Sequence, residues 1–252
     1  MLRIRDLTVN YDSVPILEGV NLDVRRGEFV SLVGPSGSGK TSILRAIVRL
    51  LRPQSGTVDL DVAASDIGFL FQDDALLPWR TARENVALGQ RIRDLARPEA
   101  EARADQWLAS IGLAGFGGRY PRQLSGGQRK RVALAQVLAL EPTLLLMDEP
   151  FASLDAIVRT RITEELIAWV ERKHLTVLLV THDLEEAITL SDVVYVLSQG
   201  PRATIRTRHA IDIPRPRHVL QSRGHARFAP LLEELWNELA GAAGRIAGEG
   251  QA

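Results

Sequence analysis

Apolar residues alternate with polar ones, or cluster in short runs, in the first third of the chain, which is the pattern of partly or fully buried strands. Strands are therefore expected at residues 2–9, 20–24, 29–33, 58–60 and 67–71. From Thr41 onward the apolar spacing fits one face of a helix instead. We expect this helix to stop near Arg52, because Pro53 disfavours the helical conformation in the residue before it.

The middle of the chain, about 78–140, has helical spacing of its apolar residues. Thr81 and Glu84 form a capping-box pattern at its start, and a further helix is expected over residues 126–140. Strands and helices then alternate, with strands at 143–147, 176–181 and 193–198 and helices at 156–172 and 184–190. This alternation predicts an α/β fold with a mostly parallel sheet, into which the helical block is inserted.

The character of the chain changes after residue 200. Residues 202–227 hold seven arginines and one acidic residue, Asp212. Such a stretch is usually a solvated polar surface, but contact with lipid headgroups, a membrane partner or a regulator stays open. Nucleic acid is a weaker alternative, because no aromatic residues are interleaved with the arginines.

A short amphipathic helix is expected from Pro230, where proline suits a first helical turn. Its apolar face would consist of Leu231, Leu232, Leu235, Trp236 and Leu239. The expected organisation is one domain over residues 1–200, with the helical subdomain at about 78–140 inserted, followed by an Arg/Pro-rich extension over 201–252.

Composition excludes several classes of protein. The chain has 252 residues, 45% of them hydrophobic, with 31 basic and 31 acidic residues and no cysteine. These values exclude a disordered chain, a collagen-like repeat, a disulfide scaffold and a thiolate metal site. No apolar run approaches the length that crosses a bilayer, and the first residues lack the apolar core of a signal peptide. We therefore expect any membrane role to act through a partner.

A glycine-rich loop lies between an expected strand and an expected helix. It fits the pattern G-x-x-x-x-G-K-[ST] as Gly34, Pro35, Ser36, Gly37, Ser38, Gly39, Lys40 and Thr41. Main-chain N–H groups of such a loop bind phosphate, helped by the positive end of the helix that follows. Lys40 would reach the terminal phosphates, and Thr41 would bind Mg²⁺. Ser42 supplies a second hydroxyl one residue later.

Two carboxylates end the apolar strand at 143–147. Asp148 is placed to bind Mg²⁺, and Glu149 is placed to polarise an attacking water. A solvated acidic turn is the alternative for this pattern alone.

A second candidate anion site begins the helix at residue 126. Leu124 is followed there by Ser125, Gly126, Gly127 and Gln128. Ser125 and Gln128 also fit a capping box, which remains an alternative explanation. A cap does not require the two glycines, which weaken the start of a helix but let an anion approach its main chain.

From Met1 to about Ser198 the sequence resembles the nucleotide-binding subunits of ATP-binding-cassette (ABC) transporters. The resemblance rests on Lys40 with its loop, on Asp148–Glu149 and on the LSGGQ segment from Leu124. It implies a P-loop NTPase core, a small antiparallel β subdomain, and ATP and Mg²⁺ as ligands. It also implies a head-to-tail dimer, a homodimer here, in which Ser125 meets the ATP on the partner's phosphate loop. Such a helix end could stabilise the transferring phosphoryl group, since the sequence shows no arginine finger.

Other positions match the family one by one. Tyr11 corresponds to the aromatic residue that stacks on adenine, and Gln72 to the glutamine that meets Mg²⁺ and the attacking water. His182 corresponds to the histidine that contacts the γ-phosphate, which makes Glu149, Gln72 and His182 the implied catalytic residues. Residues 153–155, which include Ser153, resemble the loop that crosses the dimer interface, although they also fit a helix cap.

Several segments resemble the bacterial nitrate, sulfonate and taurine import ATPases, among them Leu76–Trp79 and Pro214–Arg217. In that group the stretch after Gln72 meets the membrane permease, so we expect docking at Phe71–Thr81. Packing of Leu76, Leu77 and Trp79 inside the helical block is the rival interpretation. The short interval between Gly56 and Gln72 and the presence of Gln136 in place of an arginine depart from the pattern.

The resemblance implies an ATP-hydrolysing subunit of a bacterial importer for a small solute, peripheral at the cytoplasmic face of the inner membrane. Its partners would be a second ATPase subunit, permease subunits and, indirectly, a substrate-binding protein, with no nucleic acid. A soluble cassette ATPase that acts on a non-transport partner is the main alternative. An ATP-regulated binding subunit with little turnover is a third, against which Glu149 and His182 argue.

Overall fold

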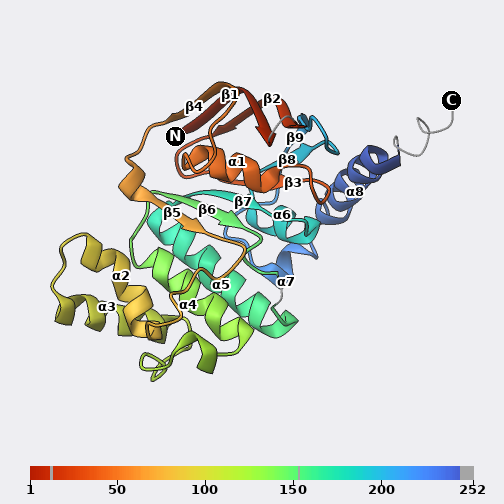
Figure 1. Ribbon diagram of the computed structural model, residues 1–252. Coiled ribbons are helices and arrows are strands. Elements are labelled where there is room, and N and C mark those ends of the chain that lie inside the picture. The colour runs from red at the N-terminus through yellow and green to blue at the C-terminus, as the bar shows by residue number, and fades with distance from the viewer. Residues whose placement is uncertain (12–13, 153, 245–252) are drawn as a thin grey trace. The chain divides into compact units, whose positions relative to one another are not determined.

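The computed structural model describes residues 1–11, 14–152 and 154–244, which form two compact units (Figure 1). The first unit comprises Met1–Ala64 and Lys173–Ala252, and the second comprises Ser65–Arg172. No helix in the described part of the chain is long and apolar enough to cross a bilayer.

An antiparallel sheet of three strands opens the first unit. Its order is β2-β1-β4, with bounds Leu2–Tyr11 for β1, Val14–Val24 for β2 and Ser55–Leu60 for β4. Strand β2 starts six residues before the expected position. Register shifts along β1, between Ile4 and Leu7 and between Leu7 and Val9, break the two-residue period that the sequence pattern relies on.

Four further strands of the first unit lie in the order β7-β3-β8-β9. Their bounds are Phe29–Val33 for β3, Thr176–Val180 for β7, Val193–Leu197 for β8 and Ile205–Ala210 for β9. β3 is parallel to both neighbours, whereas β9 is antiparallel to β8. Every residue of β3, β7 and β8 is buried, which explains why these strands read as continuous apolar runs.

Four helices complete the first unit, namely α1 (Lys40–Ile47), α6 (Leu184–Leu190), α7 (Val219–Ser222) and α8 (Phe228–Gly244). α6 and α8 pack together and share one apolar cluster with β3 and β8 (Figure 1). The expected apolar face of α8 is confirmed for Leu231 and Leu235 but wrong for Trp236, which is 65% exposed. Each residue turns about 100° from the one before it, so Trp236 points away from its buried neighbour.

Helix α1 ends at Ile47, five residues before the expected stop at Arg52. Arg49 adopts a left-handed conformation with φ 60°. Its N–H bonds the carbonyl of Ala46, and the N–H of Leu50 bonds the carbonyl of Arg45. This pair of hydrogen bonds is a Schellman motif, which closes the helix before Pro53 has any effect.

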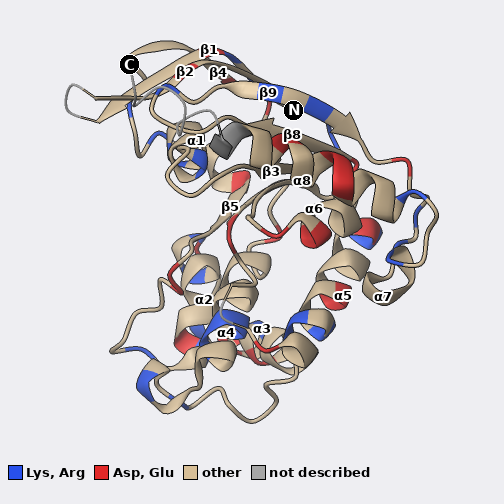
Figure 2. Cartoon of the chain, turned by 90° about the vertical axis from the view of Figure 1, so that its right-hand side faces the viewer, with Lys and Arg blue, Asp and Glu red and all other residues tan. Residues whose placement is uncertain are grey.

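The arginine-rich stretch is more than a solvated surface. Strand β9 was not predicted from the sequence. Its Arg206 and Arg208 are exposed, so basic side chains lie along the strand (Figure 2). Arg217, by contrast, is 4% exposed, and its guanidinium donates to the carbonyls of Ile213, Ile211 and Ser191. It also lies 3.4 Å from an oxygen of Asp192. These partners precede Arg217 by up to 26 residues, so sequence pattern alone did not reveal them.

The Arg217→Met variant is expected to lower the free energy of unfolding by about 2–3 kcal/mol, because the carbonyls of Ile213, Ile211 and Ser191 lose the guanidinium donor. Urea unfolding followed by circular dichroism measures this change. Arg206→Met on the exposed side of β9 is the control and is expected to change stability by less than about 0.5 kcal/mol. Equal stability of the two variants would show that Arg217 does not hold the extension.

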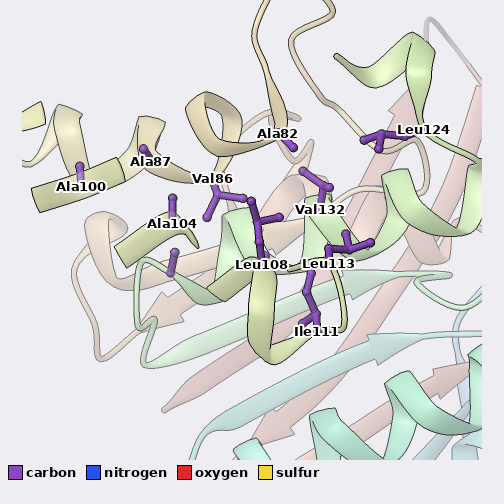
Figure 3. Close-up of a cluster of buried hydrophobic side chains, with 12 residues drawn as sticks. Ala82, Val86, Ala87, Ala100, Ala104, Leu108, Ile111, Leu113, Leu124 and Val132 are labelled. Atoms are coloured by element: carbon purple, nitrogen blue, oxygen red, sulfur yellow. The ribbon is translucent and has the colours of Figure 1, made fainter. Parts of the chain in front are cut away.

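The second unit contains two parallel strands, β5 (Ile67–Leu70) and β6 (Leu144–Asp148). Its helices are α2 (Ala82–Ile92), α3 (Arg97–Ser110), α4 (Gly126–Leu138) and α5 (Ala156–Lys173), with short 3₁₀ turns η1 (Ala64–Asp66) and η2 (Pro121–Gln123). The inserted helical block is thus confirmed as α2, α3 and α4. In its core, Ala87 of α2 lies near Ala100 and Ala104 of α3, whereas Ala82 lies toward Leu124 and Val132 (Figure 3). Larger side chains of the same core are Val86, Leu108, Ile111 and Leu113.

The expected capping box starts α2. The Thr81 hydroxyl accepts the Glu84 N–H at 3.3 Å, and the Thr81 N–H donates to the Glu84 carboxylate at 2.9 Å. The hydrogen bond from the Thr81 main chain lowers the pKa of Glu84 below its ordinary value. The carboxylate therefore stays ionised and stabilises the positive end of the helix.

Candidate nucleotide site

The glycine-rich loop joins the buried end of β3 to the start of α1. Its Ser38 N–H bonds the Pro35 carbonyl at 3.2 Å, which closes a tight turn. Gly39 has φ 87°, and a Cβ there would lie 2.7 Å from the Leu17 side chain of β2. Glycine is therefore required at this position for both conformation and space. Gly39 also leaves the N-terminus of α1 without a side-chain cap, as a helix end that binds an anion requires.

Lys40 lies across this loop. Its Nζ donates to the carbonyls of Gly34 at 2.8 Å and Pro35 at 2.9 Å, and the residue is 6% exposed. The Ser38 hydroxyl is buried and has no hydrogen-bond partner within the described residues. An ammonium group and a hydroxyl are thus held at the loop, next to Thr41 and the buried Ser42 in the first turn of α1. Both groups can donate to phosphate oxygens.

Two other predicted residues of the first unit lie near this loop in the fold. His182 is exposed and follows β7, the parallel neighbour of β3, so it lies at the same edge of the sheet as the loop. Tyr11 ends β1 and is 40% exposed, with its hydroxyl 3.4 Å from Nη1 of Arg45 on α1. The first unit therefore groups the predicted phosphate loop, histidine and aromatic residue around β3 and α1.

The second unit groups the predicted carboxylates with the glutamine. Leu70 of β5 pairs with Met147 of β6, so Gln72 and Asp148–Glu149 leave the same edge of this parallel pair. Asp148 is 3% exposed, whereas Glu149 is half-buried. Glu149 has φ 46°, a conformation that costs free energy in a residue other than glycine. Such strain is typical of positions where the direction of a side chain matters for function.

The candidate anion site at α4 has the geometry of a capped helix. The Ser125 hydroxyl accepts the Gln128 N–H at 3.2 Å, and the Ser125 N–H donates to the Gln128 side chain at 2.9 Å. The capping interpretation is thus confirmed, and Ser125 and Gly126 are exposed. Neither Gly126 nor Gly127 has positive φ, and among the described residues a Cβ at either would meet nothing closer than 3.5 Å. Neither main-chain conformation nor contact with a described residue accounts for the two glycines.

The segment Phe71–Thr81 contains both packed and exposed side chains. Leu76 packs against the core of the helical block, but Trp79 is 70% exposed. The fully buried Asn85 holds the turn through hydrogen bonds to Leu77, Arg80 and Thr81. The rival interpretations of this segment thus apply to different residues of it, and Trp79 is presented outward on a fixed turn.

Some residues that shape these sites were not identified from the sequence. Asn85 is one, and Asp74, Arg129 and Lys130 at the Gln72 loop are the others. The sequence pattern that could have indicated their contact is a pair of acidic residues after Gln72 and adjacent basic residues after Gln128. Of the predicted interface loop, Ser153 lies outside the described residues. Asp155 accepts the Val158 N–H at 2.9 Å, as a cap of α5 does.

The donor atoms of three predicted residues suit Mg²⁺. Thr41, Gln72 and Asp148 would supply a hydroxyl, an amide and a carboxylate oxygen, which are ligands that Mg²⁺ prefers. The described residues contain no group of three His, Cys, Asp or Glu side chains that could hold a metal alone. A hydroxyl, an amide and a carboxylate oxygen each suit an ion that completes its shell with water and substrate phosphates, as Mg²⁺ commonly does.

Comparison with known proteins identifies the family to which the chain is similar. Residues 17–152 match the protein family described as ABC transporter. The aliphatic sulfonates import ATP-binding protein SsuB 2 of Nocardia farcinica is 45% identical over 228 residues, which cover 90% of this chain and 91% of that protein. The nitrate import ATP-binding protein NrtC of Synechococcus elongatus is 40% identical over 230 residues, 88% of this chain.

The chain spans 35% of the length of NrtC and 34% of the bicarbonate transport ATP-binding protein CmpC of the same species. Among solved structures, the dimeric post-hydrolysis state of the ATP-binding cassette MJ0796 bound to ADP and Pi has a TM-score of 0.77 and 33% identity. The match covers 85% of this chain and 100% of that one. The loop around Lys40, the helix start at Ser125 and these similarities together show that the chain belongs to the ABC transporter family and has the fold of its ATP-binding cassettes.

Proposed function

We propose that this chain is the ATP-hydrolysing subunit of a bacterial importer for a small solute of the nitrate, sulfonate or taurine kind. The observation that carries the proposal is the uncapped start of α1 with Lys40 folded across the loop before it. The names of the relatives, which include sulfonate and nitrate import ATP-binding proteins, support the importer assignment. The chain would act as a peripheral subunit at the cytoplasmic face of the inner membrane.

In the proposed reaction, Lys40 exchanges its two carbonyl partners for the β- and γ-phosphates of ATP. N–H groups from Gly37 to Thr41 bind the same phosphates, while Tyr11 stacks on the adenine. Glu149 accepts a proton from the attacking water, which Gln72 orients, and His182 contacts the γ-phosphate. Positioning and charge stabilisation account for most of the rate in phosphoryl transfer.

Mg²⁺ would be held by Thr41, Gln72 and Asp148. When bound, it would neutralise charge that develops on the β- and γ-phosphate oxygens. The burial of Asp148 favours this role, because a carboxylate shielded from solvent attracts a cation more strongly than an exposed one.

The exposed helix start at Ser125 would serve a second copy of the chain. Neither positive φ nor packing against the described residues requires Gly126 and Gly127, so their lack of side chains would serve a ligand from outside the chain. In a head-to-tail dimer, Ser125 to Gln128 of each copy would bind the γ-phosphate on the partner's loop. The dimeric MJ0796 structure with bound ADP and Pi supports this arrangement.

Phe71–Thr81 would dock against the permease, with Trp79 as its anchor, because an exposed tryptophan on a fixed turn can fill a pocket of a partner. The test measures ATP hydrolysis in nanodiscs, with and without a permease encoded beside this chain and its substrate-binding protein loaded with taurine, an alkanesulfonate or nitrate. The permease is expected to stimulate turnover by about tenfold or more, a change that P-loop enzymes show on assembly with partners.

Trp79→Ala is expected to lose this stimulation while basal hydrolysis remains. Ile92→Ala, which changes another exposed apolar residue of the second unit, is the control and should keep the stimulation. Hydrolysis that no permease changes would favour a cassette ATPase with a non-transport partner and would overturn the importer assignment.

A further inference from the structure

Three charged residues join the Gln72 loop to helix α4. An oxygen of the Asp74 carboxylate lies 3.2 Å from Nε of Arg129, and the other oxygen lies 3.6 Å from Nζ of Lys130. The Lys130 ammonium also donates to the main-chain carbonyl of Gln72 itself. The side chains of Asp74 and Lys130 are 19% and 11% exposed, so water screens this pair far less than a surface pair.

The same group of residues reaches the start of α4. Nη1 of Arg129 donates to the carbonyl of Leu124 at 2.9 Å, and Leu124 immediately precedes Ser125. Arg129 and Lys130 lie about one helical turn after Ser125, and helical side chains lean toward the N-terminus of their helix. Arg129 therefore holds Asp74 on one side and the main chain before Ser125 on the other.

Gln72 lies beyond the end of its strand, so the hydrogen bonds of the sheet do not fix its main chain. β5 ends at Leu70, and Gln72 lies two residues beyond it. The hydrogen bond from Lys130 fixes the peptide that carries the Gln72 side chain, and the contacts with Asp74 fix the chain two residues later. A loop held at two points presents its side chain in a narrower range of directions than a loop held at one end.

We propose that Asp74, Arg129 and Lys130, which we call the loop tie, are positioning residues that make Gln72 and Ser125 move as one body. This inference rests on the proposed function, because it assigns the purpose of the tie to ATP hydrolysis. Without the tie, the nucleotide still binds at the first unit, but Gln72 is no longer held where it orients the attacking water. Removal of the tie therefore lowers kcat and leaves KM for ATP nearly unchanged.

The test compares Lys130→Met, Asp74→Asn, the double variant and the conservative Lys130→Arg. Lys130→Met and Asp74→Asn are each expected to lower kcat by about tenfold, with KM for ATP within about twofold of the parent. The loss of kcat in the double variant should be smaller than the product of the two single losses, because both changes remove the shared Asp74–Lys130 pair. Lys130→Arg should recover most of the turnover, since a guanidinium can make both contacts.

Hydrogen–deuterium exchange of peptides that cover residues 71–77 gives a readout that does not depend on activity. Without nucleotide, Lys130→Met and Asp74→Asn are expected to speed exchange there by about tenfold. Arg103→Met removes a matched but exposed ion pair with Glu99 on α3, and is the control that should change neither exchange at 71–77 nor kcat.

If both variants exchange residues 71–77 at the rate of the parent, the proposal that the tie holds this loop would be overturned. A lower melting temperature with unchanged kcat would also overturn its positioning role, because it would leave the contacts merely structural. If the parent chain itself hydrolysed no ATP, the proposed function would fail, and the exchange measurement alone would decide whether the tie exists.

Discussion

In the Glu149→Gln variant, ATP is expected to bind with nearly the parent's affinity while turnover falls by at least about a hundredfold, since an amide cannot accept the proton of the attacking water. The substitution preserves the size and shape of the side chain, so the main chain of residue 149 should keep its φ of 46°. ATP that stays unhydrolysed should hold two copies together. Size-exclusion chromatography with Mg-ATP measures this as a shift from monomer to dimer.

Glu141→Gln is a matched control for this experiment. Glu141 also has φ 46° and lies in the second unit, but it follows α4 and was not predicted to contact nucleotide. Its variant should retain turnover and should not accumulate as a dimer. A Glu149→Gln chain that remains monomeric with ATP, or that turns over ATP like the control, would contradict the assignment of Glu149 as the base.

The Lys40→Ala variant is expected to lose about a thousandfold in turnover and to bind ATP more weakly. Removal of the ammonium takes a charged donor from the β- and γ-phosphates, and stabilisation by a charged donor inside a closed site is commonly worth two to three powers of ten. It also removes the bonds to the carbonyls of Gly34 and Pro35, which hold the loop in shape.

Lys173→Ala at the exposed end of α5 is the charge-matched control and should hydrolyse ATP like the parent. Lys40→Arg is not expected to rescue turnover, because a guanidinium is broader than the ammonium that fits between two carbonyls. Near-parental turnover in Lys40→Ala would contradict the phosphate-loop assignment.

Parts of the fold and site that depend on contiguous residues were predicted from the sequence. The loop from Gly34 to Thr41 is one example, because its turn, its glycines and the helix after it are consecutive. The capping boxes at Thr81 and Ser125 are others, since their partners lie three residues away. Parallel pairing followed from apolar runs such as β3 and β7, which lie adjacent to each other.

Features that depend on distant partners were not predicted. β9 escaped detection because Arg206 and Arg208 occupy its exposed face, so the strand reads as a polar stretch. Nothing in the sequence around Arg217 distinguishes it from the other arginines, because the carbonyls that it contacts are placed by the fold. Lys130 meets a carbonyl 58 positions earlier in the sequence, and no local pattern encodes such a contact.

If two copies of the chain complete each other's ATP sites, two variants that are each inactive should restore hydrolysis when they are mixed. Lys40→Ala keeps an intact helix start at Ser125 but has a damaged loop. Gly126→Asp keeps an intact loop but places a carboxylate where the partner's phosphate would lie. A Cβ at residue 126 meets no atom of the described residues closer than 3.8 Å.

Each variant alone is expected to be inactive. In an equal mixture half of the dimers combine the two, and each mixed dimer has one complete site, so the account predicts about a quarter of the parent's turnover. A mixture that forms mixed dimers, as pull-down of a tagged copy would show, yet stays as inactive as its two components would contradict the account.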